Sequence, residues 1–149
     1  MRCQEIMSKN PATVQMNASV QEVARLMADK DIGFVPIVDQ SGRAVGTVTD
    51  RDIAIRVTAE GKDPAETPVR EVMTPDVRYC FEDEDVEHVA ENMAEQQLRR
   101  LPVVSRDKRL VGIVSLGNLA QTEGRAANKA VKGVTKPSGQ HNQGPGSRG

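Results

Sequence analysis

The chain contains two copies of one sequence pattern, and the second copy is displaced by 66 residues from the first. Without a gap, residues 5–7 (Glu-Ile-Met) align with 71–73 (Glu-Val-Met), and 36–38 (Pro-Ile-Val) align with 102–104 (Pro-Val-Val). The match keeps apolar spacing, turn residues and glycines in register together, which indicates an internal repeat. Two copies are too few for a solenoid, so each copy is expected to cover the other's apolar face in a pseudo-twofold pair.

Each copy carries the same order of expected elements: a short strand, a helix, two strands joined by a turn, and a second helix. Ser19 and Glu22 form a capping box before the first helix. The apolar run 34–38 predicts a buried strand, and turn residues 39–42 lead into another strand over 43–48. This order predicts a mixed α/β (α+β) fold. The residues that share one face of the helix are Val20, Val23, Ala24 and Met27.

The expected organisation is a first motif over 1–60, a linker loop over 61–68, a second motif over 69–123 and a tail over 124–149. The tail nearly lacks large apolar side chains, so it is predicted to be disordered. Every acidic residue lies at or before Glu123, whereas five of the 20 basic residues lie in the tail. Five scattered charges without aromatic neighbours favour a solubilising tail over a nucleic-acid tether.

Several sequence features argue against a membrane protein, a metalloprotein or an enzyme. No apolar run is long enough to span a bilayer and no signal peptide is recognisable, so a cytoplasmic location is expected. Cys3 and Cys80 form no C-x-x-C pair and are expected to be reduced and partly packed, although their pairing stays open. The acidic run 82–85 is interpreted as a helix N-terminus, in preference to a cation site. His88 has no partner at ligand spacing, and no catalytic or metal-binding set is found.

Thr49 and Asp52 lie where the second strand of the first copy ends and a helix is expected to begin. A carboxylate there has two acceptor oxygens, which suit the neighbouring hydroxyls of a ribose. The missing side chain of Gly46, three residues before Thr49, would leave room for a ligand close to the strand. A phosphate would instead favour arginine, and Arg99 and Arg100 precede the corresponding strand of the second copy. An adenine would fit between aliphatic side chains such as those of Leu98 and Thr47.

A structural interpretation of the same residues competes with the binding site. Thr-x-x-Asp at a helix start is also a capping box, and Asp52 has the spacing of an i, i+4 ion pair with Arg56. Arg99 and Arg100 would then form a solvated patch. On these residues alone, capping is the favoured interpretation.

The doubled pattern resembles the cystathionine beta-synthase (CBS) domain pair, or Bateman module. The resemblance is carried by the apolar-Pro-Val strands, the Gly-apolar-apolar-[Ser/Thr] junctions, and the openings at Met7-Ser8 and Met73-Thr74. The sequence Thr-Asp-Arg-Asp-Ile at 49–53 is similar to a signature of small stand-alone bacterial members. The resemblance covers about residues 3–121 and implies two β-α-β-β-α motifs packed sheet to sheet.

Members of this family bind adenosine-containing ligands such as AMP, ADP, ATP or S-adenosylmethionine between the two motifs. In the second of the two clefts that the resemblance implies, Asn118 replaces the acid and Gly33-Phe34 replaces the arginine pair, so that cleft is expected to be weak or empty. The resemblance implies a stronger cleft formed by Thr47, Thr49, Asp52, Leu98, Arg99 and Arg100. The weaker cleft would be formed by Ile32, Gly33, Ser115 and Asn118.

Family members also form homodimers through their helices, and several residues give this chain apolar helical surface: Ile53, Ala54, Val57, Leu116, Leu119 and Ala120. The favoured function is a regulatory adenosine-nucleotide sensor that acts on an unknown protein partner. One alternative is a ligand-free, stress-related interaction dimer in which Thr49 and Asp52 only cap a helix. Another is a nucleic-acid-associated protein that uses the basic tail. An enzyme is the least favoured class.

Overall fold

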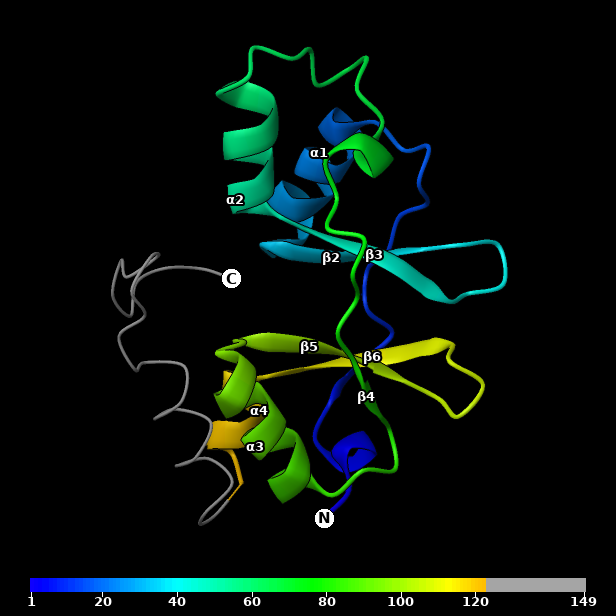
Figure 1. The fold of residues 1–149 in the computed structure, drawn as a ribbon, viewed down its shortest axis with the longest axis vertical. Helices are drawn as coiled ribbons and strands as arrows, with labels where there is room; N and C mark the ends of the chain where they lie inside the picture. Colours follow the sequence, from blue (N-terminus) through cyan, green and yellow to red (C-terminus); the bar gives the residue numbers. More distant parts are fainter. Residues whose placement is uncertain (123–149) are drawn as a thin grey trace. The chain divides into compact units, whose positions relative to one another are not determined.

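The structure, a computed structural model, describes residues 1–122, which divide into two compact units (Figure 1). The first-repeat unit comprises Pro11–Arg78 and Lys108–Leu110. The second-repeat unit comprises Met1–Asn10, Tyr79–Asp107 and residues 111–122. The opening segment of each repeat therefore belongs to the unit of the other repeat. The tail predicted to be disordered, 124–149, lies outside the described residues.

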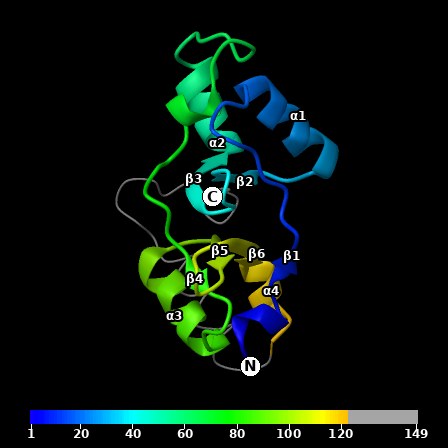
Figure 2. The same cartoon turned by 90° about the vertical axis from the view of Figure 1, so that its right-hand side faces the viewer.

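The first-repeat unit is a helix-covered hairpin. Strands β2 and β3 pair antiparallel, with Phe34 opposite Thr49 and a register shift after Ile37. Both α1 and α2 lie on the same face of this hairpin in the two views (Figures 1 and 2). The predicted first strand is a single parallel bridge between Val14 and Ile37. The elements are α1 (Val20–Lys30), β2 (Phe34–Val38), β3 (Ala44–Thr49), α2 (Asp50–Ile53), a π-helical turn η2 (Ala54–Thr58) and a 3-10 turn η3 (Val69–Glu71).

The second-repeat unit repeats this plan with a longer sheet. Its strands lie in the order β1-β6-β5-β4, with β1 antiparallel to β6 and β4 parallel to β5. Helices α3 and α4 lie together on one face of that sheet (Figures 1 and 2). The elements are a 3-10 turn η1 (Cys3–Glu5), β1 (Ser8–Lys9), β4 (Cys80–Phe81), α3 (Val86–Gln96), β5 (Arg100–Val104), β6 (Leu110–Ser115) and α4 (Leu116–Ala120). The predicted mixed α/β fold is confirmed.

Each unit has its own hydrophobic core, formed between the helices and the strands they cover. The predicted apolar face of α1 is confirmed at Val20, Val23 and Met27, which are buried, but Ala24 of the predicted set is exposed. Ser19 caps that helix by accepting a hydrogen bond of 3.1 Å from the Glu22 amide. At the other end, Asp31 takes a left-handed conformation (φ 53°) that ends the helix. Among residues 1–122, no helix is long and apolar enough to cross a membrane.

Residues 61–68, the expected linker loop, belong to the first-repeat unit and are held at the start of α1. The Thr67 hydroxyl donates to the Asp63 carbonyl at 2.7 Å, and the Thr67 carbonyl accepts from the Val20 amide at 2.9 Å. A second bond of 3.1 Å joins the Gln21 amide to the Pro64 carbonyl. Two of the amide groups that the first turn of a helix leaves unsatisfied are therefore bonded to this loop.

The expectation that Gly46 leaves room for a ligand is wrong, because a methionine of the same unit fills that space. A Cβ atom at Gly46 would lie 2.5 Å from the Met73 Sδ atom and 3.2 Å from the Thr74 carbonyl oxygen. The backbones of Thr47 and Thr74 exchange two hydrogen bonds of 3.0 and 2.8 Å, which fix this approach. The glycine is therefore needed for packing of the chain on itself.

Gly112 has the same role against the opening segment of the first repeat. A Cβ atom there would lie 2.5 Å from the Met7 Sδ atom and 2.8 Å from the Ser8 carbonyl oxygen. At both glycines the closest atom is a methionine Sδ, but the nearest backbone atom is farther away at Gly46, 3.2 Å compared with 2.8 Å.

Gly112→Ala is expected to lower the free energy of unfolding by about 1–3 kcal/mol, because the backbone of β1 must move to admit the methyl group. Gly46→Ala is the matched variant and should have the smaller effect, since Met73 can change rotamer. Urea denaturation of both variants measures the difference. An equal or larger loss for Gly46→Ala would contradict the backbone clash as the cause.

Two of the six residues expected to provide a dimer surface do not lie on the surface. Val57 and Leu119 are each 1% exposed and are members of the two cores. The helices concerned are short, so their apolar faces are needed to cover their own strands. Ala54 and Ala120 are exposed, as expected. The structure adds Ile55, which is 46% exposed and was not predicted.

Candidate adenosine-binding corners

Thr49 and Asp52 form a reciprocal capping box at the end of β3. Thr49 is the last residue of the strand and keeps an extended backbone, so its side chain faces the first turn of α2. Its Oγ1 atom accepts from the Asp52 amide at 3.1 Å, and the Asp52 Oδ2 atom accepts from the Thr49 amide at 2.9 Å. The capping interpretation of these two residues is therefore confirmed.

We call this strand-to-helix junction the Thr49–Asp52 corner. The capping box leaves part of the hydrogen-bonding capacity of the corner unused. The second carboxylate oxygen of Asp52, Oδ1, forms the expected i, i+4 ion pair with the Arg56 Nε atom, but at 4.0 Å it is too far away to accept a hydrogen bond. The Arg56 Nη1 atom instead donates to the Val72 and Met73 carbonyls, at 2.9 and 3.3 Å. Within residues 1–122 the hydroxyl hydrogen of Thr49 has no acceptor. The corner therefore offers an ionised acceptor on Asp52 and a hydroxyl donor on Thr49.

The corresponding corner of the second-repeat unit has the same backbone geometry and less capacity. Ser115 Oγ accepts from the Asn118 amide at 3.2 Å. The Asn118 Oδ1 atom accepts twice, from the Ser115 amide and from the Ser115 hydroxyl, both at 2.9 Å. Both of its lone pairs and the serine proton are used within the corner. What remains is the Asn118 amide group, which only donates, and one lone pair of the Ser115 hydroxyl.

In each unit the segment before the Pro-Val strand contacts the corner of the same unit. The Gly33 carbonyl accepts from the Asp50 amide at 3.0 Å, and the Arg99 carbonyl accepts from the Leu116 amide at 3.0 Å. A Cβ atom at Gly33 would lie 2.8 Å from the Asp50 Oδ2 atom, so the glycine permits the close approach.

The predicted binding residues are thus distributed between the two units. Ile32, Gly33, Thr47, Thr49 and Asp52 lie in the first-repeat unit. Both backbone groups of Thr47 are bonded to Thr74. The second-repeat unit contains Leu98, Arg99, Arg100, Ser115 and Asn118. Each predicted cleft combines residues of both units, and that combination stays a prediction.

The acidic run 82–85 has structural partners, as the helix-start interpretation predicted. Asp85 caps α3 by accepting from the Glu87 amide at 3.3 Å, and Glu84 accepts from the Phe81 amide at 3.0 Å. Arg106 binds both carboxylate oxygens of Asp83, at 2.9 and 2.7 Å, and these hydrogen bonds hold the pKa of Asp83 below its usual value. Among residues 1–122, no group of three or more potential metal ligands is present.

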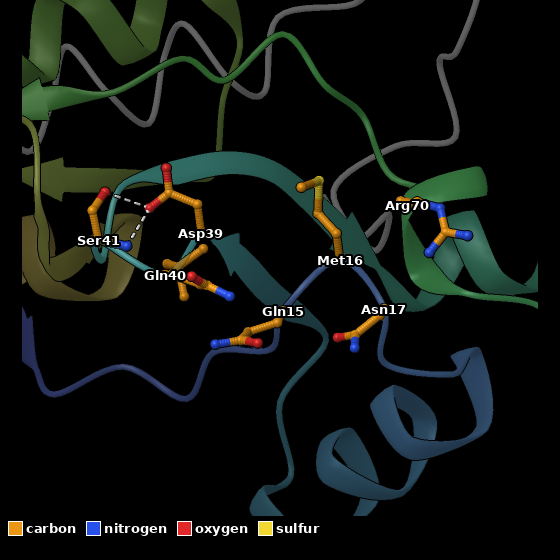
Figure 3. A pocket seen from close by; sticks show the side chains of 8 residues that line it. Gln15, Met16, Asn17, Asp39, Gln40, Ser41 and Arg70 are labelled. Carbon is orange, nitrogen blue, oxygen red and sulfur yellow. Dashed lines mark hydrogen bonds between the residues drawn. The ribbon is translucent and has the colours of Figure 1, made fainter.

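A hollow of about 630 Å³ opens in the first-repeat unit, beside the β2–β3 turn (Figure 3). Asp39 closes that turn: its Oδ1 atom accepts from the Ser41 amide and hydroxyl at 2.9 and 2.6 Å, and these bonds lower its pKa. The predicted binding residues do not line this hollow. Sequence reasoning missed it because most of its lining comes from segments without periodicity. The lining residues are Gln15, Met16, Asn17, Val38, Asp39, Gln40, Ser41 and Arg70.

Comparison with known proteins identifies the class. The family model of the CBS domain matches residues 3–58 and 69–123, and the chain belongs to this family. It is 41% identical over 133 residues to the CBS domain-containing protein YhcV of Bacillus subtilis, covering 88% of this chain and 93% of YhcV.

Solved structures agree with this assignment. The CBS domain protein TA0289 of Thermoplasma acidophilum, of unknown function, superposes with a TM-score of 0.76 and 31% identity over 89% of this chain and 75% of that one. The CBS domain pair of protein MJ0100, solved in complex with 5′-methylthioadenosine and S-adenosyl-L-methionine, gives a TM-score of 0.72 and 36% identity. That match covers 81% of this chain and 94% of the other.

Proposed function

We propose that this protein is a regulatory sensor that binds an adenosine-containing ligand, with the ribose held by Thr49 and Asp52. The observation that carries the proposal is the hydrogen-bonding capacity that this corner retains after the capping box has formed. Asp52 retains one carboxylate oxygen, and Thr49 retains a hydroxyl hydrogen. A ribose presents two neighbouring hydroxyl groups, each able to donate and to accept. The relative MJ0100 has a CBS pair solved with two adenosine compounds, which supports this ligand class.

Of the remaining residues of the proposed site, Thr47 belongs to the first-repeat unit, and Leu98, Arg99 and Arg100 belong to the second-repeat unit. Leu98 would contact the adenine, and Thr47 would contact it from the other side. Arg99 and Arg100 would neutralise the phosphates of AMP, ADP or ATP, or the carboxylate of S-adenosylmethionine. The ligand would regulate a protein partner only if it binds two arrangements of the chain with different affinities.

Isothermal titration calorimetry with AMP, ATP and S-adenosylmethionine tests the proposal. At least one of these ligands should bind with a measurable Kd, and its 2′-deoxy analogue should bind more weakly because one ribose hydroxyl is missing. Equal affinity for the ribose and deoxyribose forms would place the sugar away from Asp52. If no adenosine ligand binds, the ligand-free interaction protein becomes the better interpretation.

We also propose that the chain forms a homodimer through helical surface that its own cores leave exposed. Ile55 is the observation that favours this proposal, since a large aliphatic side chain that is 46% exposed lies beside exposed Ala54.

Ile55→Glu is expected to convert a dimer into a monomer, because the charge would be desolvated in the contact. Light scattering should show a mass of about twice the 16.2 kDa chain for the natural protein and the single-chain mass for the variant. A natural protein that stays monomeric at all concentrations would contradict the dimer. Met16→Glu, at an exposed methionine away from α2, serves as the control and should leave the mass unchanged.

A further inference from the structure

The two cysteines of the chain lie against each other in the core of the second-repeat unit. Cys3 and Cys80 are 77 positions apart in the sequence, yet their sulfur atoms are 3.7 Å apart. Both residues are fully buried. Sequence reasoning left their pairing open, because spacing alone does not bring them together.

Hydrogen bonds hold the backbone on both sides of the sulfur pair. The Cys3 amide donates to the Glu84 carbonyl at 2.8 Å, and the Val86 amide donates to the Met1 carbonyl at 2.9 Å. Cys80 lies in β4, paired with Val103 of β5. The sulfur atoms must approach by only about 1.7 Å to reach the length of a disulfide bond. Side-chain rotation can supply a movement of this size without rearrangement of the sheet.

The hydrogen bond between the two thiols makes them chemically unequal. It lowers the pKa of Cys3 and raises the pKa of Cys80, with burial adding to the increase. The thiolate is the reactive form of a cysteine, and the lowered pKa favours that form at Cys3.

Access to Cys3 requires only a local opening of the segment that carries it. Within 1–5, Cys3 is the only buried residue. Backbone hydrogen bonds tie this segment to 82–86, and a local opening of the segment would break only a few of them. A small peroxide would reach the sulfur in this open form.

We propose that Cys3 and Cys80 are a redox modification site that forms a reversible intramolecular disulfide under peroxide. The Cys3 thiolate attacks one peroxide oxygen, the O–O bond breaks, and a sulfenic acid forms while the other oxygen leaves as water after protonation. Cys80 then attacks the sulfenic sulfur, the S–S bond forms, and a second water leaves with the Cys80 proton. Two thiols are oxidised and one peroxide is reduced. A dithiol reductant restores both thiols and itself becomes a disulfide.

The bond would close a covalent ring that contains the larger of the two segments of the first-repeat unit. The residues between the cysteines include Pro11–Arg78, while both cysteines belong to the second-repeat unit. Closing so long a loop restricts the unfolded chain strongly. The oxidised form is therefore expected to melt roughly 10 °C higher than the reduced form.

Treatment of the reduced full chain with hydrogen peroxide, followed by alkylation in denaturant and intact-mass measurement, tests the site. The expected product has lost two hydrogen atoms, takes up no alkylating reagent, and yields a peptide that links Cys3 to Cys80. Dithiothreitol should restore two reactive thiols and the lower Tm. Cys3→Ala should leave one thiol that alkylates after the same treatment.

Three results would overturn the proposal: two reactive thiols after peroxide, sulfinic acid in place of the crosslink, or crosslinks only between chains. All three are measured on the natural sequence, so the test does not depend on the folding of a variant. Two closely packed thiols with no tendency to join would then be simple core residues.

Discussion

Leu101→Ala is expected to lower the free energy of unfolding by about 3–4 kcal/mol, the largest stability effect foreseen for a single substitution in this chain. Leu101 is 1% exposed in β5 and belongs to the core that also contains Met93 of α3 and Leu119 of α4. Removing three carbons leaves a cavity between the sheet and both helices, and a closely packed core closes such a cavity only in part. Urea denaturation monitored by circular dichroism measures the loss.

The internal repeat supplies a matched control for this prediction. Val35 occupies the corresponding place in β2 of the other core and is fully buried. Val35→Ala removes two carbons and should lower the free energy of unfolding by about 1.5–3 kcal/mol. Met16→Ala, at a side chain 39% exposed, should change it by less than about 0.5 kcal/mol. A smaller loss for Leu101→Ala than for Val35→Ala would contradict the assignment of Leu101 to the centre of its core.

The elements with strong local patterns were predictable from the sequence. The periodic apolar residues after Ser19 and Asp85 gave both long helices, and the apolar-Pro-Val runs gave the central strands β2 and β5. Periodicity is reliable here because each element buries a single continuous face.

The exchange of opening segments between the units was not predictable. Strand β1 is only two residues long, so its sequence contains no period that indicates its partner β6. Gly46 and Gly112 did mark a close approach to the strand, but the sequence could not show that Met73 and Met7 are the groups that approach. Sequence reasoning also treated Val57 and Leu119 as surplus surface, whereas short helices need those residues for their own cores.

Part of the chemistry of the two corners was predictable from the sequence. The residue types Thr-x-x-Asp and Ser-x-x-Asn determine the capping boxes, which are local in sequence. The remaining capacity depends on hydroxyl direction and on the distance to Arg56, which are properties of the folded chain. The structure shows how the two corners differ. The Asn118 side-chain oxygen accepts two hydrogen bonds, whereas one carboxylate oxygen of Asp52 accepts no hydrogen bond.

Asp52→Asn is expected to weaken adenosine-ligand binding roughly 10- to 100-fold, because it removes a charged acceptor from the proposed ribose contact. The substitution should preserve the fold, since Asn118 forms the same capping box in the second-repeat unit. Calorimetric titration of both proteins with the tightest-binding adenosine ligand measures the ratio of Kd values. Circular dichroism and Tm report whether the corner is intact.

Asn118→Asp is the reciprocal variant, and it separates ribose recognition from a general effect of charge. A carboxylate at position 118 would still accept from the Ser115 amide, as Asp52 does from Thr49, and would gain an ionised oxygen. Binding at the Thr49–Asp52 corner should change by less than about threefold, and any new binding should appear as a second, weaker site. If Asn118→Ala abolished binding while Asp52→Asn left it intact, the occupied corner would be the one in the second-repeat unit. In that case the ligand-binding corner would not be determined by the difference between the two side chains. Asp52 has one carboxylate oxygen that accepts no hydrogen bond, whereas the Asn118 oxygen already accepts two.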